Sequence, residues 1–279
     1  GGLCDLSVGT PVDSVPELIQ RALASAADAP GYPTNHGTSE LREAISDWLA
    51  RRLGVIGVDP AAVLPAIGTK ELIAGLPRLL GVHAGQQVVI PETAYPTYEV
   101  GALLAHAQPV RADSLTQLGP STPAMMWLNS PSNPTGRVLG VDHLRKVVQW
   151  ARERGVLVVS DECYIELGWT GDRPRSILDP DVCGPSHDGL LAVHSLSKRS
   201  NLAGYRFGFV VGDLGIVARL LEIRKHSGFM VPTPVQVAAT AASITGTGAA
   251  TFCASMTVQR PVPFCSARSR MTSSIGRPV

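Results

Sequence analysis

Apolar residues recur at two different spacings along this chain of 279 residues. Between residues 38 and 54 they recur every three or four positions, which predicts an amphipathic helix that ends at Gly54. Residues 142–155 repeat the pattern, with Asp142 as the expected cap and Gly155 as the residue that stops the helix. The apolar faces are Leu41, Ala44, Ile45, Trp48 and Leu49 in the first helix, and Leu144, Val147, Val148 and Ala151 in the second.

Shorter apolar runs lie between the helical patterns and contain few polar residues. Such runs are typical of strands that are buried on both faces of a sheet. Strands that alternate with helices predict βαβ units, and therefore an α/β fold around a mostly parallel sheet. The predicted strands are residues 63–67, 87–90, 124–128, 156–160, 190–194 and 207–211.

Composition narrows the class of protein. The net charge is +1 and 44% of the residues are hydrophobic, which suits a globular protein with a large core and gives no electrostatic case for nucleic acid or a membrane surface. No run approaches the roughly 18 apolar residues of a membrane span, and no basic and then apolar leader opens the chain. We therefore expect a cytoplasmic protein.

The cysteines point the same way. They are odd in number and show neither a Cys-x-x-Cys motif nor histidine spacing for a metal, so we expect free thiols in a reducing compartment and no metal site. The five are Cys4, Cys163, Cys183, Cys253 and Cys265.

The last part of the chain breaks the pattern. Glu222 is the last acidic residue, and from about Thr245 onward no helical or strand period remains. This composition predicts a segment that buries too little apolar surface to fold, or translation out of frame, with a genuine domain as the alternative. We divide the chain into an N-terminal segment (1–30), a large domain (31–242) and an unpatterned tail (243–279).

Lys198 is the first candidate for chemistry. It follows a predicted strand in Ser195-Leu196-Ser197-Lys198, and Arg206 comes shortly after. The amine can form a Schiff base with an aldehyde cofactor, while hydroxyls and a guanidinium can take a phosphate dianion. A solvated loop lysine explains the tetrapeptide equally well, so the upstream segments decide.

Three upstream segments also follow predicted strands. Gly68-Thr69-Lys70 opens a helix, where backbone N–H groups can hold a phosphate. Tyr95 could stack on a planar ring or could be a half-buried core tyrosine. Asn133 stands in a proline-rich turn and could offer its amide to a ring oxygen. Turn chemistry alone would also explain the prolines, although an ordinary turn does not require two of them so close together.

Asp161 and Tyr164 close a fourth segment at the end of a predicted strand. A carboxylate at the carboxyl edge of a parallel sheet lies where ligands bind. There it can keep a pyridine nitrogen protonated, because each charge favours the other, and Tyr164 could donate a hydrogen bond to a ring oxygen.

Taken in order, these motifs resemble the fold-type I pyridoxal-phosphate aminotransferases of class I/II. The resemblance rests on Asn133-Pro134-Thr135-Gly136, Asp161-x-x-Tyr164 and Ser195-x-Ser197-Lys198 with Arg206, and it covers roughly residues 6–242. It implies a three-layer αβα large domain, pyridoxal 5′-phosphate as cofactor, and transfer of an amino group between an amino acid and a 2-oxo acid.

The resemblance also implies a role for each matching residue. Lys198 would form the Schiff base and carry the proton, with Asp161 and Tyr164 as the other catalytic residues. Tyr32 would reach the phosphate of a second subunit in a homodimer, and Gly9 would lie near the substrate carboxylate together with Asn133. The expected cofactor-binding residues are Tyr32, Gly68, Thr69, Lys70, Tyr95, Asn133, Asp161, Tyr164, Ser195, Ser197, Lys198 and Arg206.

Within the family, the chain looks most like the N-succinyldiaminopimelate aminotransferases of lysine biosynthesis, which implies N-succinyl-LL-2,6-diaminopimelate and 2-oxoglutarate as substrates. The family's smaller C-terminal domain, with an arginine that clamps the substrate carboxylate, is missing or aberrant. The arginines of the tail do not match its context; they are Arg260, Arg268, Arg270 and Arg277.

Three alternatives therefore stay open beside the aminotransferase. The chain could be a cofactor-binding but catalytically impaired fragment, a pyridoxal-phosphate-dependent carbon–sulfur lyase, or a non-catalytic cofactor-binding or dimerisation module. The lack of a helix-turn-helix pattern or basic face counts against a regulator that binds DNA.

Overall fold

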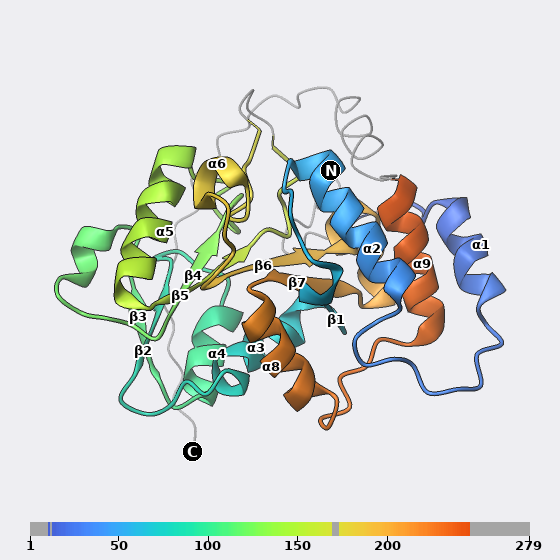
Figure 1. Ribbon diagram of the computed structural model, residues 1–279, viewed down its shortest axis with the longest axis horizontal. Coiled ribbons are helices and arrows are strands. Elements are labelled where there is room, and N and C mark those ends of the chain that lie inside the picture. The colour runs from blue at the N-terminus through green and yellow to red at the C-terminus, as the bar shows by residue number, and fades with distance from the viewer. Residues whose placement is uncertain (1–10, 12, 169–172, 246–279) are drawn as a thin grey trace, which may run out of the picture.

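A computed structural model describes residues 11, 13–168 and 173–245 of the chain. Its centre is a sheet with the strand order β1-β7-β6-β5-β4-β2-β3 (Figure 1). Neighbouring strands from β3 across to β6 run parallel, whereas β7 is antiparallel to both β6 and β1. The predicted mostly parallel sheet is confirmed. The strands are β1 (Val63–Ala66), β2 (Gln87–Ile90), β3 (Gln108–Arg111), β4 (Met125–Asn129), β5 (Leu157–Asp161), β6 (Leu190–Ser195) and β7 (Gly208–Gly212).

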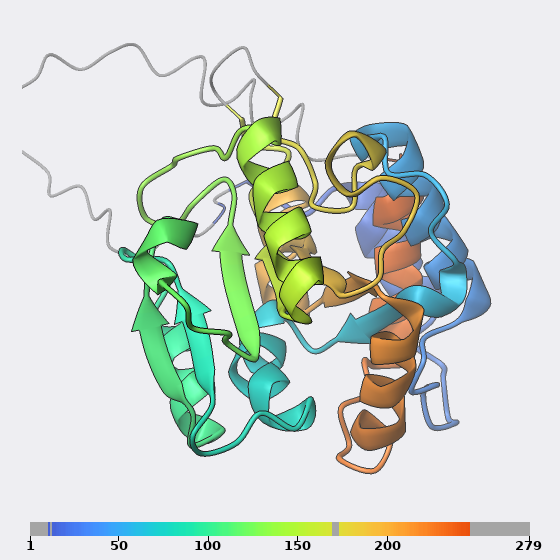
Figure 2. The same cartoon turned by 60° about the vertical axis from the view of Figure 1, so that its left-hand side comes forward.

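Helices cover both faces of this sheet and give three layers, which Figures 1 and 2 show from two sides. One face carries α2 and α5, with α9 packed on α2; the other carries α3, α4 and α8. The helices are α1 (Glu17–Ser25), α2 (Ser39–Trp48), α3 (Thr69–Leu79), α4 (Thr97–Leu104), α5 (Val141–Arg154), α6 (Pro180–Cys183), α7 (Leu196–Arg199), α8 (Leu214–Arg224) and α9 (Thr233–Thr245). Short helical turns are η1 (Leu49–Leu53), η2 (Pro60–Ala62), η3 (Leu115–Leu118) and η4 (Ala203–Tyr205).

The core consists of two apolar clusters, one on each face of the sheet. Successive side chains of a strand point to opposite faces, so Val158 joins the cluster on the α2 and α5 side while Val159 joins the cluster on the α3 and α4 side. Trp48 of α2 is buried in the first cluster, and Tyr98 of α4 and Trp127 of β4 are buried in the second. Each strand of the centre is therefore covered on both sides.

The two predicted amphipathic helices form as α2 and α5. The Thr38 side chain caps α2 by accepting from the Leu41 N–H, and the helix continues through the π-helical turn η1 to Gly54, which is left-handed at φ 73°. Gly155 ends α5 in the left-handed region as predicted. Asp142 as the cap of α5 is wrong: Gly140 occupies the cap position, and Asp142 lies in the first turn, 3.1 Å from Arg145.

The predicted strands are confirmed to within a residue or two at either end. Most run further at the carboxyl end than the apolar pattern does, because Asn129, Asp161 and Ser195 still pair in the ladder although they are polar. The edge strand β3 was not predicted. Two of its four residues, Gln108 and Arg111, are exposed, so it lacks the continuous apolar run of a central strand.

The two ends of the described chain lie side by side, because α1 packs against α9 (Figure 1). Ile19 of α1 is fully buried in the core cluster beside α2. Helix α9 continues to Thr245, three residues into the stretch predicted as unpatterned, and the remainder of that stretch lies outside the described residues. Within the described ranges, no helix combines the length and apolar character needed to cross a bilayer.

Candidate active site

The strand register brings polar residues from distant segments to one edge of the sheet. Asn129 of β4 lies beside Asp161 of β5, and Ser195 of β6 lies beside Gly208 of β7, which in turn pairs with Ala66 of β1. Chain segments that leave these strands carry Thr69 and Lys198. This is the carboxyl edge of the parallel strands, where open α/β sheets bind ligands.

Asp161 is a buried carboxylate at this edge, with 5% of its surface exposed. The Tyr98 hydroxyl donates to its Oδ2 at 2.7 Å, and the Cys163 N–H donates to its Oδ1 at 3.2 Å. Burial raises the pKa of Asp161, and the hydrogen bonds from Cys163 and Tyr98 oppose that rise. Burial also raises the pKa of Tyr98, so its phenol stays a proton donor.

Sequence reasoning did not single out Tyr98. The signal was its position one helical turn after Tyr95, in a helix that begins at the carboxyl end of a strand. The two rings meet edge to face with centroids 5.8 Å apart, and Tyr98 stacks on Trp127 at 5.0 Å. Tyr95 and Tyr164 are half-buried. Burial raises the pKa of Tyr164, and the nearby Cys163 and Asp161 raise that pKa further by smaller amounts.

The N-terminus of α3 forms the candidate phosphate site. Its cap, Gly68, has φ 74° and no side chain, so the first backbone N–H groups of the helix have no capping oxygen. A Cβ at Gly68 would collide with the Arg206 guanidinium, and a Cβ at Gly208 would come within 2.7 Å of Thr69 Cγ2. The absence of side chains at Gly68 and Gly208 thus lets Arg206 and Thr69 lie close to the backbone at the start of α3.

Lys198 lies in α7, which the Ser195 side chain caps by accepting from the Ser197 N–H at 3.1 Å. Burial lowers the pKa of the Lys198 amine, while Cys163 raises it by a smaller amount. The Cys163 thiol also donates to Thr69 Oγ1 at 3.7 Å. The turn after β5 therefore links the lysine segment to the start of α3.

Asn129 is a second residue that sequence reasoning missed. Its amide Nδ2 donates to the Asp161 carbonyl oxygen at 3.0 Å, and its Oδ1 accepts from the Asn133 N–H at 2.6 Å. The loop that carries Asn133 is thus tied to the end of β5. The signal in the sequence was that Asn129, like Asp161, is a polar residue at the carboxyl end of an apolar strand.

Two of the remaining predicted residues have exposed side chains. Tyr32 is 95% exposed, and the Lys70 side chain is also exposed at the surface of α3. Gly9 lies outside the described residues. Cys163 and Cys183 are free thiols, and the described residues contain no group of three or more His, Cys, Asp or Glu that could hold a metal.

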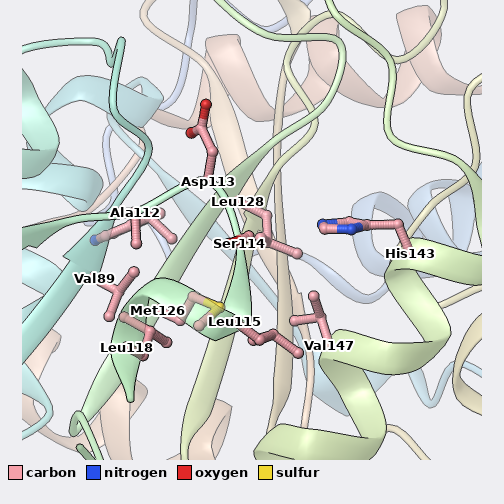
Figure 3. Close-up of a pocket in the computed structure, with 11 residues that line it drawn as sticks. Val89, Ala112, Asp113, Ser114, Leu115, Leu118, Met126, Leu128, His143 and Val147 are labelled. Carbon is pink, nitrogen blue, oxygen red and sulfur yellow. The ribbon is translucent and has the colours of Figure 1, made fainter.

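Two cavities open beside the site. Figure 3 shows the smaller, of about 30 Å³, between β2, β4, η3 and α5, with His143 and Asp113 at its rim. The larger, of about 190 Å³, extends along the loop after β4 and is lined in part by Asn129, Ser132 and Thr135. Neither is lined by Lys198 or Asp161.

Comparison with known proteins places this geometry in a family. The family model described as aminotransferase class I and II matches residues 2–257. The chain belongs to the class I and II aminotransferases. The fold and the family predicted from the sequence are confirmed.

Relatives and solved structures agree with this membership. The chain is 67% identical over 241 residues to the probable aminotransferase Rv1178 of Mycobacterium tuberculosis, 59% to the 4-dedimethylamino-4-oxo-anhydrotetracycline transaminase OxyQ of Streptomyces rimosus, and 35% to the LL-diaminopimelate aminotransferase of Aquifex aeolicus. These matches cover 86%, 86% and 80% of this chain but 57%, 67% and 60% of the relatives. The chain thus spans about two thirds or less of their length.

Among solved structures, the aminotransferase AspB of Helicobacter pylori superposes with a TM-score of 0.81 at 27% identity, over 88% of this chain and 69% of that one. The N-succinyldiaminopimelate aminotransferase of Mycobacterium tuberculosis has a TM-score of 0.79 at 24% identity, over 90% and 67%. At that identity the second likeness concerns the fold alone.

The cofactor of class I and II aminotransferases is pyridoxal phosphate, and the residues present fit it. The start of α3 offers uncapped N–H groups beside Arg206, which pairs with no carboxylate in the described part of the chain and suits a phosphate. Asp161 is a buried carboxylate with no basic side chain against it among the same residues, and it suits a protonated ring nitrogen. Positive groups are thus available for the phosphate of the cofactor, and a negative group is available for its protonated ring nitrogen.

Proposed function

We propose that this chain carries the cofactor site of an aminotransferase that moves an amino group between an amino acid and a 2-oxo acid. The observation that supports this most is the buried Asp161, held by Tyr98 at the sheet edge that also carries Lys198. A carboxylate placed to stabilise a pyridinium, on the same sheet edge as an amine whose pKa burial lowers, suits proton transfer at a carbon bonded to nitrogen.

When bound, pyridoxal phosphate supplies an electron sink that stabilises negative charge on the α-carbon of the substrate. Lys198 acts as the proton carrier, because its lowered pKa increases the fraction of neutral amine at neutral pH. Asp161 keeps the ring nitrogen protonated, and the Tyr98 hydroxyl holds the Asp161 carboxylate in one orientation.

The other residues bind and orient the cofactor. We assign the phosphate to the α3 N-terminus, through Gly68, Thr69 and the Lys70 backbone, together with the side chains of Ser195, Ser197 and Arg206. We assign ring stacking to Tyr95, the ring oxygen to Asn133 and Tyr164, and contacts near the substrate carboxylate to Gly9 and Asn133. The exposure of Tyr32 is consistent with a contact to the phosphate of a second subunit, so we also propose a homodimer.

For the substrate we propose N-succinyl-LL-2,6-diaminopimelate with 2-oxoglutarate as the acceptor. The relatives named LL-diaminopimelate aminotransferase support a diaminopimelate-type donor. The relative at 59% identity bears the name of a tetracycline-pathway transaminase, so a cyclic ketone is the second acceptor class to be assayed.

The test is a half-reaction on the purified chain loaded with pyridoxal phosphate. Each amino donor is added in turn, and both the cofactor absorption and the carbonyl product are followed. We expect the donor to become its 2-oxo acid. In Lys198→Ala the rate of this conversion should fall by at least about 10²-fold. Release of pyruvate and sulfide from cysteine-type donors would instead indicate a lyase. Cofactor binding without conversion of any donor would indicate a cofactor-binding module, in keeping with the chain's partial coverage of its relatives.

A further inference from the structure

Three residues of the active site each have a sequence neighbour that lies in one buried cluster on the opposite face of the sheet. Glu162 follows Asp161, His194 precedes Ser195, and Arg199 follows Lys198. Their exposed fractions are 1%, 2% and 6%. We call Glu162, His194 and Arg199, together with Trp48 of α2, the rear cluster.

The members of the rear cluster touch one another directly. Glu162 Oε2 lies 3.4 Å from His194 Nε2. The His194 ring meets Trp48 edge to face at 5.3 Å, and the Arg199 guanidinium lies over the Trp48 ring at 3.9 Å. Trp48 therefore joins the end of β6 to α7, and His194 joins β6 to the turn after β5.

The rear cluster and the cofactor side are separated by the sheet itself. His194 also stacks on Phe209 at 5.1 Å, and both Trp48 and Phe209 belong to the apolar cluster on the α2 side. Asp161, in contrast, is bonded to Tyr98, which belongs to the apolar cluster on the α3 and α4 side. Asp161 and Glu162, and likewise Ser195 and His194, thus point to opposite faces, as an extended chain requires. Lys198 and Arg199 are consecutive residues of the helix α7 instead.

Ionic contacts extend the rear cluster at its rim. Arg199 Nη1 lies 3.4 Å from Glu166 Oε2, and Arg52 Nε donates to Glu166 Oε1 at 2.9 Å. The Ile177 N–H donates to Glu162 Oε1 at 2.7 Å. The charged and titratable groups that face the rear cluster are therefore Glu162 and Glu166 after β5, His194 on β6, Arg199 on α7 and Arg52 on η1.

Burial of the ionisable side chains in the rear cluster costs desolvation free energy. Within the described residues, Glu162 Oε2, both His194 ring nitrogens, and Nε and Nη2 of Arg199 are buried and make no hydrogen bond. Apolar side chains of similar volume would fill the space without that desolvation cost. Packing alone therefore gives no reason for three ionisable residues here.

We propose that Glu162, His194 and Arg199 are positioning residues, which fix Asp161, Ser195 and Lys198 relative to one another from behind the sheet. Each pair of neighbours shares a peptide unit, so holding one side chain in the rear cluster restricts the backbone that presents the other. A displacement of about 1 Å at reacting groups is enough to cost about 10²-fold in rate. The roles of Asp161, Ser195 and Lys198 in cofactor binding rest on the proposed function. The coupling of their backbone positions to the rear cluster does not.

The test compares two isosteric changes of carboxylate to amide in the same sheet. Glu162→Gln alters the rear cluster. Asp213→Asn is the matched control, because Asp213 also accepts backbone N–H bonds, from Gly189 at 2.8 Å and Ile216 at 3.0 Å, at the opposite end of β6. Backbone hydrogen exchange is measured by mass spectrometry on the full chain without cofactor, so no step depends on cofactor binding.

In Glu162→Gln we expect exchange to accelerate by about tenfold not only in the peptide with Asp161 but also in the separate peptide with Ser195 and Lys198. In Asp213→Asn the acceleration should stay near Gly189 and Ile216. Acceleration in Glu162→Gln that is confined to its own peptide would overturn the proposal. Arg199→Met serves as a second variant, with the reverse expectation that the Asp161 peptide responds.

A second measurement connects the rear cluster to the cofactor. The pH midpoint of the absorption band of bound pyridoxal phosphate should shift in Glu162→Gln, and the dissociation constant of the cofactor should rise by about tenfold, as when partners behind a ligand group are removed. Asp213→Asn should change neither. An unaltered midpoint and constant in Glu162→Gln would contradict a positioning role even if the variant unfolds at a lower temperature. Failure of the unmodified chain to bind cofactor would count against the proposed function only, because the exchange result stands by itself.

Discussion

At the scale of single residues, Asp161 is the group on which the proposed cofactor site depends most. It is a buried carboxylate that receives one hydrogen bond from a side chain of α4 and one from its own turn. Burial raises its pKa, and a cation beside it would lower that pKa again. Asp161 is thus stabilised as a carboxylate chiefly by the partner that it is proposed to bind.

Tyr98→Phe tests this arrangement. Removal of the phenol leaves Asp161 Oδ2 without its donor, so we expect the free energy of unfolding to fall by about 1–3 kcal/mol. Urea denaturation of the cofactor-free chain measures it. Tyr95→Phe is the control, because the Tyr95 hydroxyl makes no hydrogen bond among the described residues and the phenylalanine ring keeps the edge-to-face contact with Tyr98. Equal losses in both variants would contradict the assigned role of the Tyr98 hydroxyl.

Glu162 gives a second prediction, through pH. Burial raises its pKa to about 7 from 4.5. A group whose pKa is higher in the folded state stabilises fully below its unfolded pKa, and that stability is lost as the pH rises through the folded value. Burial lowers the pKa of the neighbouring His194 to about 3. His194 is present both in the parent chain and in Glu162→Gln, so its titration cancels when the two are compared.

We therefore expect the unfolding free energy of Glu162→Gln minus that of the parent chain to rise by up to about 3 kcal/mol between pH 5 and pH 8, because the parent loses stability as Glu162 ionises and glutamine cannot ionise. The measurement is urea unfolding of both proteins across that range. A stability difference that does not vary with pH would show that Glu162 keeps an ordinary pKa in the fold.

At the scale of secondary-structure elements, the starts of helices do the binding. Helix α3 begins at a glycine in the left-handed region, directly against Arg206. Such a start presents N–H groups and a positive dipole end to an anion. Its position is set in part from α8, where Arg224 donates to both carboxylate oxygens of Glu71, at 3.1 Å and 2.7 Å.

Gly68→Ala tests the start of α3. Both the left-handed φ and the collision with Arg206 oppose a side chain there, so we expect weaker binding of pyridoxal phosphate, by about tenfold or more, through loss of one charge-assisted contact. Gly57→Ala is the matched control: its φ is 75°, but a Cβ there meets nothing within 4 Å. Each change should cost about 1 kcal/mol of stability. Equal cofactor affinities, measured by fluorescence titration, would contradict the phosphate assignment.

Arg224→Met tests the link between α8 and α3. The Arg224 side chain is 2% exposed, and its removal takes away the ionic partner of Glu71 and leaves it the Ile67 N–H as a donor, so we expect a loss of about 3 kcal/mol in unfolding free energy. Lys225→Met, which breaks the neighbouring exposed pair with Glu222, should cost less than about 1 kcal/mol. Thermal and urea unfolding of the two variants measure the difference, and similar losses would show that the buried pair contributes little.

The sequence was informative about elements for physical reasons. Central strands and amphipathic helices are strongly patterned because burial selects their residues. The edge strand β3 is half exposed and carries no such pattern. Helix α5 begins at Val141, earlier than predicted, because Gly140 occupies the cap position that was assigned to Asp142. A glycine has no side chain that could mark it as a cap in the sequence. Asp161 and Lys198 were found because the first ends a strand and the second follows one closely. For Tyr98 and Asn129 the sequence position was suggestive, but the tertiary hydrogen bonds to Asp161 through which they act are not encoded in the spacing.

At the scale of the whole molecule, one sheet collects segments that are far apart in the chain. The order β1-β7-β6-β5-β4-β2-β3 places the loops after residues 66, 129, 161 and 195 on a single edge. The chain spans only 57% to 67% of its curated relatives named here, so conversion of substrate and dimerisation are separate questions from cofactor binding. Cofactor binding through Lys198 is the claim on which the rest depends.

The most direct test of that claim is to trap the cofactor on the chain. The purified protein is incubated with pyridoxal phosphate, reduced with borohydride and digested, and the modified lysine is identified by mass spectrometry. The account predicts that Lys198 carries the label and that Lys70, which stands beside the proposed phosphate site but is exposed, does not. Label on Lys70 instead, or none on Lys198, would contradict it.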